Sequence, residues 1–241
     1  MVLYLPEVAL YTAPAGNGFL RWQDKETIYM SIGIIYCETL KSEIQTLAGK
    51  IPQISHMKEM PYGLHIDPEE LLAEVRRQII VLQEHVDVIV LGYGRCQSLD
   101  RLGKNFKVPV LLPEAEDCIG VLLGQKRYEK EIKNIPGTWF LSPGWTRMGT
   151  EFVFLELQLS RIGHKNIDPL QLARRMLDGF SRALYIDIPS CDENEELRLK
   201  AQKISEDLGL RLEETKGSCD MLEKVIRQAL YVANQSTSDS E

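Results

Sequence analysis

The sequence predicts an α/β fold in which a mostly parallel sheet is flanked by helices. Three observations predict it: short apolar runs of strand length, amphipathic segments with helical spacing, and a regular alternation of the two along the chain. Such an alternation is typical of parallel strands joined by right-handed crossovers. We therefore expect the strand ends to gather at one edge of the sheet.

The predicted strands are apolar runs at 29–36, 86–91, 108–112, 138–141, 183–188 and 210–213. The predicted helices lie at 38–48, 68–82, 118–123, 168–180, 193–208 and 219–232. The helix at 68–82 has the clearest pattern, because Leu71, Val75 and Ile79 recur at helical spacing after the capping residue Asp67. Residues 50–62 contain two prolines and are expected to form a loop.

The domain organisation follows from composition. Residues 1–28 are turn-rich and are expected to form an N-terminal extension on the main fold. Residues 29–232 are expected to form a single α/β domain, or two α/β lobes that meet near 146–166. The polar segment 233–241 is expected to be a flexible tail.

Composition and charge restrict the function classes. With 44% hydrophobic and 26% charged residues, the chain has the composition of a folded globular protein. Its formal net charge of −7 argues against binding to nucleic acid or to an anionic membrane. No stretch approaches the roughly 20 apolar residues of a membrane span, and the start MVLYLPEVAL lacks the basic flank of a signal peptide. Small molecules or proteins are the expected partners.

The chain has five cysteines, an odd number that does not indicate a disulfide framework in a chain of this length. We therefore expect reduced thiols, no structural disulfide and a cytoplasmic location.

Cys37, Cys96 and Cys118 each follow a predicted strand. Because parallel strands deliver their C-terminal ends to the same edge, the three thiols are expected to converge there. Soft thiolates select Zn²⁺ or an iron–sulfur cluster, so the sequence predicts a metal site that holds Zn²⁺ or a [4Fe–4S] cluster. The alternative is that the cysteines only fill core volume. Cys191 also follows a predicted strand and is a candidate fourth ligand, whereas Cys219 is expected to be structural.

Two residues near these cysteines are candidate catalytic groups. Asp117 precedes Cys118 at a predicted helix start, where it caps the helix or else orients or protonates a ligand. His65 lies just before the helix at 68–82 and is a candidate nitrogen ligand or general acid–base, or else packs or caps. Glu114 and Glu116 make the loop before Cys118 acidic, which suits a cation better than a phosphate.

Three further residues are candidate cofactor-binding groups. Tyr93 and Gly94 lie in a glycine turn that resembles a phosphate loop only weakly, since the full GxGxxG pattern and the P-loop lysine are missing. Trp145 ends a rigid Ser-Pro-Gly-Trp turn and is expected either to cover a planar ligand or to pack in the core.

Longer motifs carry a resemblance to a known family. They are YC..L at 36–40, GLH.DPEELL at 63–72, LGYGRC at 91–96, PEAEDCIGVLLGQKRY at 113–128, PGTWFLSPGW at 136–145 and FSRALYIDI at 180–188. With these motifs the chain resembles domain-of-unknown-function family 1638 over about residues 30–230. The resemblance implies that the family's cysteines fall on Cys37, Cys96 and Cys118.

The resemblance also implies a metabolic setting. Members of this family look common in methanogenic archaea and in anaerobic or phototrophic bacteria, and they look associated with corrinoid-dependent methyl-transfer systems. This chain departs from the family pattern in two places. It has Gln97-Ser98-Leu99 where relatives tend to have a glycine-rich stretch, and Glu114 and Glu116 where they tend to have Arg and His. A role of that histidine in relatives therefore does not transfer to Glu116.

Together these observations predict a cytoplasmic protein with a three-cysteine metal or iron–sulfur site. The resemblance implies that it supports corrinoid-linked or methyl-transfer metabolism, as an enzyme or as an accessory, with a corrinoid or methyltransferase component as its partner. The alternative is a non-catalytic α/β protein that binds a small molecule or a partner, whose cysteines only line the pocket.

Overall fold

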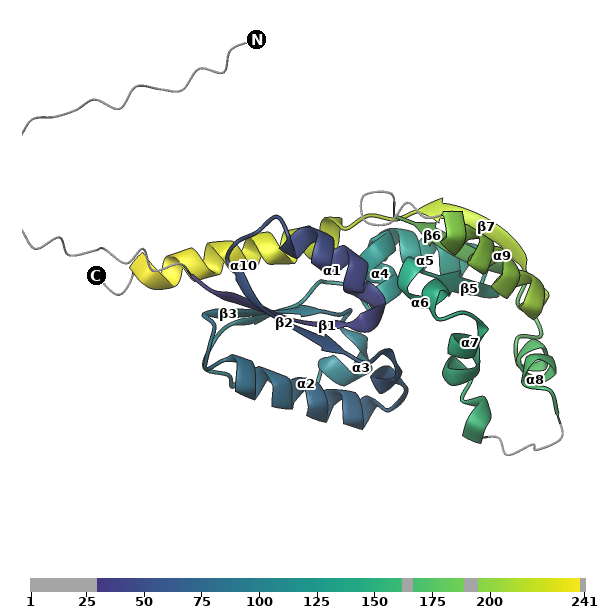
Figure 1. Ribbon diagram of the computed structural model, residues 1–241, viewed down its shortest axis with the longest axis horizontal. Helices are drawn as coiled ribbons and strands as arrows, with labels where there is room; N and C mark the ends of the chain where they lie inside the picture. The colour runs from purple at the N-terminus through teal and green to yellow at the C-terminus, as the bar shows by residue number, and fades with distance from the viewer. Residues whose placement is uncertain (1–29, 162–166, 189–194, 239–241) are drawn as a thin grey trace, which may run out of the picture.

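Two parallel β-sheets with flanking helices make up the described part of the chain (Figure 1). The computed structural model describes residues 30–161, 167–188 and 195–238. We call the four-stranded sheet with its helices lobe 1 and the three-stranded sheet with its helices lobe 2. The fold class predicted from the alternation of strands and helices is confirmed, because every strand pair in both sheets is parallel.

The sheet of lobe 1 has the strand order β2-β1-β3-β4. Its strands are β1 (Ile32–Cys37), β2 (Ile54–Met60), β3 (Val88–Gly92) and β4 (Val110–Leu111). The helices between them are η1 (Glu38–Leu40), α1 (Lys41–Ala48), η2 (Tyr62–Ile66), α2 (Pro68–Leu82), α3 (Cys96–Leu99) and α4 (Cys118–Leu123). β1 and β3 are buried along their whole length, as expected for central strands covered on both faces.

The side chains of β1 and β3 alternate between two hydrophobic cores. On one face, Ile34 and Val90 pack with Ile44 of α1. On the other face, Ile35 and Leu91 pack against the apolar side of α2. Since neighbouring side chains of a strand point to opposite faces, Tyr36 belongs to the first core and Cys37 to the second.

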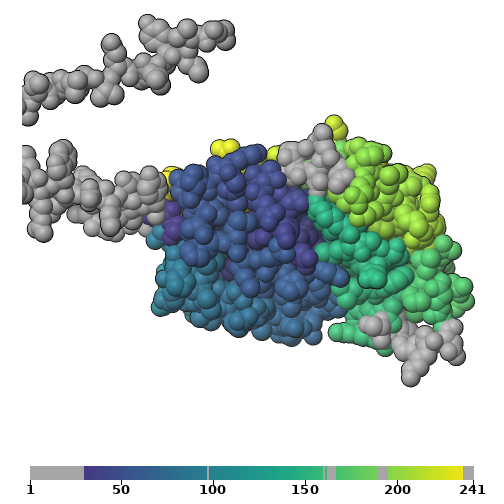
Figure 2. Space-filling view, in the orientation of Figure 1, coloured from purple at the N-terminus to yellow at the C-terminus, as the bar shows by residue number. Residues whose placement is uncertain are grey.

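The sheet of lobe 2 has the order β5-β6-β7, with β5 (Thr138–Leu141), β6 (Arg182–Asp187) and β7 (Arg211–Lys216). Its helices are α5 (Gln125–Asn134), α6 (Pro143–Arg147), α7 (Thr150–Glu156), η3 (Leu159–Arg161), α8 (Pro169–Met176) and α9 (Glu195–Leu208). Figure 2 shows that the two lobes meet without a break on the face in view.

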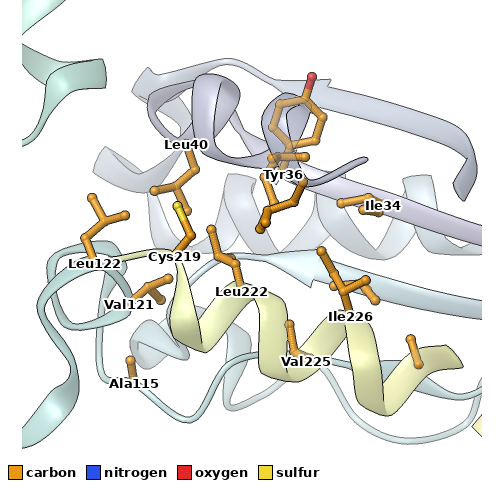
Figure 3. Close-up of a cluster of buried hydrophobic side chains, with 14 of the residues drawn as sticks. Ile34, Tyr36, Leu40, Ala115, Val121, Leu122, Cys219, Leu222, Val225 and Ile226 are labelled. Carbon is orange, nitrogen blue, oxygen red and sulfur yellow. The ribbon is translucent and has the colours of Figure 1, made fainter. Parts of the chain in front are cut away.

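The last helix, α10 (Asp220–Ser238), returns from lobe 2 to lobe 1 (Figure 1). Its buried side chains Leu222, Val225 and Ile226 lie against the first core of lobe 1, beside Ile34 and Tyr36 (Figure 3). Ile186 and Ile188 of lobe 2 belong to the same core, so the two lobes share it. The helix runs to Ser238, past residue 232 where the sequence pattern predicted its end.

The chain thus passes from lobe 1 into lobe 2 and then returns to lobe 1. The sheet of lobe 2 begins at Thr138, earlier than the 146–166 segment at which a junction was expected, and α10 completes lobe 1. The expected extension at 1–28 and the last tail residues 239–241 lie outside the described residues. None of the described helices is both long and apolar enough to cross a membrane.

The loop expected at 50–62 is wrong, because most of it is strand β2. β2 is the edge strand of its sheet, and the side chains of Ser55, His56, Met57 and Lys58 are exposed. An edge strand with solvent on its side chains carries no apolar run, so the pattern that revealed β1 and β3 is missing here.

Helix α6 of lobe 2 packs tightly on η1 of lobe 1, and Gly144 makes the approach possible. A Cβ atom at this position would lie 1.9 Å from the carbonyl oxygen of Thr39, a backbone atom that has little freedom to move. The seam between the lobes therefore requires glycine at 144.

We expect Gly144→Ala to lower the free energy of unfolding by about 3 kcal/mol, because the methyl group would force the two backbones apart. Gly63→Ala is the matched control near the same seam, where the nearest atom to an added Cβ, Cδ2 of Leu155, is 3.5 Å away. Denaturant unfolding measures both variants. Equal stability of the two would contradict the role assigned to Gly144.

Candidate functional site

The strand order of lobe 1 creates a crevice between the carboxyl ends of β1 and β3. From β1 the chain crosses to β2 on one side of it and then returns to β3 on the other side. Ligands of open α/β sheets bind at such a point, where consecutive connections leave in opposite directions. Cys37 is the last residue of β1, and Tyr93 directly follows the end of β3.

A cavity of about 260 Å³ lies at this crevice. The structure brings together there every residue for which the sequence suggested a site role within the described range: Cys37, His65, Tyr93, Gly94, Cys96, Asp117, Cys118 and Trp145. Thr39, Leu71, Ser98 and Glu156 complete the lining. The candidate fourth ligand Cys191 lies outside the described residues.

Larger hollows lie elsewhere on the surface of the described residues, and two of them are much larger. One, of about 780 Å³, runs along α10 and is lined mainly by its charged and polar side chains. The other, of about 650 Å³, lies outside Cys96 and contains Glu114 and Glu116. We place the site in the cavity of about 260 Å³, because thiols, a histidine and a buried hydroxyl group converge there.

The loops after β3 and β4 are fastened to each other beside the cavity. The backbone N–H groups of Arg95 and Cys96 donate to the carbonyl oxygens of Ala115 and Glu116, each at 2.7 Å. Gly94 packs directly on the backbone of Asp117, where a Cβ atom would lie only 2.2 Å from the carbonyl carbon. The fastening fixes Cys96 and Cys118 relative to each other, and Cys96 takes a left-handed φ of 25° in the process.

Burial keeps two of the thiols protonated. It raises the pKa of Cys37, although the Thr39 hydroxyl, which donates to its sulfur at 3.1 Å, opposes the rise. Burial also raises the pKa of Cys118 well above its usual value, and the charge of Cys37 adds to this effect. Without a cation, Cys37 and Cys118 are therefore neutral thiols at neutral pH.

The hydroxyl group of Tyr93 is buried in the same cavity wall without a hydrogen-bond partner among the described residues. Tyr93 is only 4% exposed. Burial raises its pKa far above the usual range, and the charges of Cys37, Cys118 and Cys96 raise it further. The group is thus a hydrogen-bond donor that lacks an acceptor, which is uncommon in folded proteins.

Asp117 caps helix α4. Its carboxylate accepts from the backbone N–H of Gly120 at 2.8 Å and from the hydroxyl of Tyr128. The sequence suggested that Asp117 either caps a helix or acts on a ligand. The hydrogen bonds are those of a helix cap, and the side chain also borders the cavity.

Lobe 2 closes the cavity from the opposite side. Glu156 at the end of α7 contacts Nε2 of His65, whose Nδ1 faces the carbonyl oxygen of Tyr62. The ring of Trp145 stacks on His65 with centroids 6.4 Å apart and packs against Phe152 at 4.7 Å. Trp145 therefore has aromatic partners on the protein itself as well as a position on the cavity wall.

The neighbours of His65 favour its protonated form. Burial opposes protonation of the ring, but the hydrogen bond and charge of Glu156, with the Tyr62 carbonyl, outweigh it and raise the pKa of His65. The sequence offered no signal for Glu156, because it lies far along the chain in lobe 2. Thr39 was detectable in principle, since it is two residues from Cys37.

The cysteines do not form a ready-made ligand shell for an ion. Among the described residues, no group of three or more His, Cys, Asp or Glu side chains is arranged so that it could hold a metal ion. The three cysteines at the cavity, Cys37, Cys96 and Cys118, are free thiols. Cys219 lies in the shared core rather than at the cavity (Figure 3).

Comparison with protein families identifies the chain. The family described as "Protein of unknown function (DUF1638)" matches residues 59–226, more than half of the sequence. The chain belongs to the DUF1638 family. The match includes Cys96 and Cys118 with the loops that carry them, and also His65, Trp145 and Glu156. No match was found among curated proteins.

Solved structures with partial likeness to this DUF1638 protein include ornithine carbamoyltransferases. The one from Campylobacter jejuni is 12% identical, with a TM-score of 0.25 over 78% of this chain and 56% of that chain. The one from Pyrococcus furiosus is 14% identical, with a TM-score of 0.23 over 78% of this chain and 54% of that chain. The mitochondrial one from Coccidioides immitis is 13% identical, with a TM-score of 0.23 over 79% of this chain and 57% of that chain. The chain spans about half the length of these proteins, and TM-scores this low carry no argument.

The pairing of His65 with Glu156 predicts a pH-dependent seam between the lobes. The pKa of His65 in the folded state is raised above the unfolded value of about 6.5. Below about pH 6.5 the His65–Glu156 pair therefore makes its full contribution to the stability of the fold. This contribution is lost as the pH rises through the folded-state pKa.

We therefore expect His65→Gln to lower the free energy of unfolding more at about pH 6 than at about pH 9. His56→Gln, at an exposed histidine that stacks only on His85, is the control. Denaturant unfolding at the two pH values measures the difference. A loss that is the same at both would refute the charged pair.

Proposed function

We propose that this DUF1638 protein binds a [4Fe–4S] cluster through Cys37, Cys96 and Cys118 in the cavity between its lobes. The single observation that carries the proposal is that three thiols from three different strand ends line one cavity at the crevice of the sheet. Thiolates are the ligands that iron–sulfur clusters require.

A cluster and a single Zn²⁺ ion make different demands on the thiols. Zinc holds its thiolate ligands about 2.3 Å away, so all of them gather around one point. In a cluster each cysteine binds a different iron atom. Both groups take thiolate ligands, and metal analysis separates them.

Metal binding in the cavity would require the thiols to lose their protons. Cys37 and Cys118 are neutral without a cation, because burial and mutual charge raise their pKa values. Iron makes deprotonation favourable, so binding would release protons and draw the thiolates together. The Thr39 hydroxyl at 3.1 Å from the Cys37 sulfur, and a backbone N–H of Gly94 toward Cys118, are ready to stabilise the thiolates.

Three cysteines leave one iron atom of a cluster without a cysteine ligand. When bound, such a cluster would supply an iron atom that can bind a substrate atom, or it would provide a route for electron transfer. Glu156 and Trp145 of lobe 2 line the same cavity as His65 of lobe 1. The hydrogen bond and charge of Glu156 favour the protonated form of His65, since they raise its pKa against the effect of burial.

The metabolic setting of the proposal comes from the family resemblance alone. On that basis we propose a role in corrinoid-linked or methyl-transfer metabolism. The proposed cytoplasmic location rests instead on the odd number of cysteines, which suits a compartment where reduced thiols persist. The protein's proposed partner is a corrinoid protein or methyltransferase component. Purified components of that class, tested for electron or methyl exchange with the loaded protein, provide the check.

A second function remains supported by one observation. The cavity wall contains apolar side chains such as Leu71 and Trp145, and its sulfurs are not pre-arranged for an ion. These features also fit a non-catalytic protein that binds a small molecule and uses the thiols only as lining. Metal content decides between the two functions.

The test is anaerobic purification of the full chain, followed by iron and sulfide analysis and absorption spectroscopy. We expect about four irons per chain in the wild type, as in a [4Fe–4S] cluster. Most of the iron should be lost in each of the single variants Cys37→Ser, Cys96→Ser and Cys118→Ser. The losses of iron should not add when the substitutions are combined, because the ligands act as one unit. Cys219→Ala is the matched control, since Cys219 is buried away from the cavity.

Two outcomes would contradict the cluster. If the wild type contains zinc instead of iron, and the same cysteine variants lose that zinc, the site binds a single ion and not a cluster. A folded wild type without either metal after reconstitution with iron and sulfide would leave the small-molecule binding protein as the function.

A further inference from the structure

The hydroxyl group of Tyr93 is unusual for a buried group. Its side chain is 4% exposed and lines the cavity between the lobes, and the oxygen has no hydrogen-bond partner in the described structure. A phenylalanine would fill the same space without leaving a donor unpaired. Packing therefore accounts for the ring of Tyr93 but not for its hydroxyl.

The hydroxyl is a fixed hydrogen-bond donor at the cavity. Burial raises its pKa, and so do the charges of the three cavity cysteines, which shows that the sulfur atoms lie nearby. Close packing at Gly92 and Gly94, the residues on either side of Tyr93, holds the backbone in place. Neutral thiols accept hydrogen bonds only weakly. The donor therefore needs a stronger acceptor, and a ligand can supply it.

The charged groups of the cavity disfavour an anionic ligand. The described lining contains no lysine or arginine. Its histidine, His65, already contacts the carboxylate of Glu156. The carboxylate of Asp117 accepts hydrogen bonds from two neutral groups, the backbone N–H of Gly120 and the hydroxyl of Tyr128. A carboxylate or phosphate in this cavity would be repelled by Asp117, so an uncharged acceptor fits better.

The size and walls of the cavity restrict the ligand further. A volume of about 260 Å³ has room for roughly nine water-sized groups of about 30 Å³ each. Leu71 and Trp145 supply apolar surface, and the rings of Trp145 and His65 lie nearly parallel, with their planes 9° apart. These walls suit a small, flat molecule.

We propose that the cavity binds a small, flat, uncharged carbonyl compound, such as an amide or a ketone, whose oxygen accepts a hydrogen bond from the Tyr93 hydroxyl. The inference rests on the second function above, the small-molecule binding protein, and names the class of its ligand. It involves no metal and no change of protonation. A carbonyl oxygen is a better acceptor than a neutral thiol, and unlike a carboxylate it brings no charge into the cavity.

The test measures the binding of three probes of similar size to the full chain, freed of metal with a chelator. Benzamide carries the uncharged carbonyl group, benzoate is its anionic counterpart, and ethylbenzene has no acceptor. Titrations followed by protein NMR give the dissociation constants. We expect benzamide to bind with a dissociation constant of about 1 mM or below. Benzoate should bind about tenfold more weakly, because Asp117 repels its charge.

Two variants separate the hydroxyl from the rest of the cavity. Tyr93→Phe should weaken benzamide binding about tenfold, because the buried carbonyl oxygen loses its donor, and should leave ethylbenzene binding unchanged. This variant should unfold at the temperature of the wild type or higher, since the lost hydroxyl is unpaired. Tyr36→Phe is the control, because Tyr36 is 3% exposed, lies on the other face of the sheet and donates to Glu59 at 3.3 Å. It should bind all three probes as the wild type does.

Three results would contradict the inference. If the metal-free wild type does not bind benzamide, or binds benzoate more tightly, the class of ligand is wrong. If Tyr93→Phe binds benzamide as tightly as the wild type, the hydroxyl contacts only water and does not anchor the ligand. Metal content is measured on separate samples, so the cluster and the carbonyl ligand can each fail without the other.

Discussion

The parallel pairing of β1 with β3 fixes the position of the candidate site. Tyr36 pairs with Gly92, so the next residues, Cys37 and Tyr93, leave the sheet side by side where the connections on either side diverge. The loop after β4 is then held against the loop after β3 by two backbone hydrogen bonds and by the contact of Gly94 with Asp117. Cys118 reaches the cavity only because of these constraints.

Lobe 2 turns this crevice into an enclosed cavity. In the shared core, α10 packs on lobe 1 (Figure 3). Ile186 of lobe 2 belongs to the same core, which holds the two sheets together. Gly144 lets α6 approach Thr39 closely enough for Trp145 to reach the ring of His65. Cavities between lobes are common ligand sites, because both sides supply groups and exclude water.

The cavity combines features that are costly in a protein without a ligand. It has protonated thiols near one another, a tyrosine hydroxyl without an acceptor and a cysteine backbone in the left-handed region. Local exceptions to good packing and hydrogen bonding are expected at functional sites, since a bound group resolves them. All three exceptions fall at residues that line one small cavity.

The sequence by itself determined the α/β class, most central strands and the three cysteines that follow strands. These follow from local patterns: apolar runs mark buried strands, and the parallel arrangement sends their ends to one edge. It could not reveal β2, whose exposed side chains carry no apolar run, nor Glu156, which meets His65 only through the packing of lobe 2 on lobe 1. The unpaired state of the Tyr93 hydroxyl was likewise decided by the tertiary structure, because hydrogen-bond partners depend on three-dimensional surroundings that spacing along the chain does not encode.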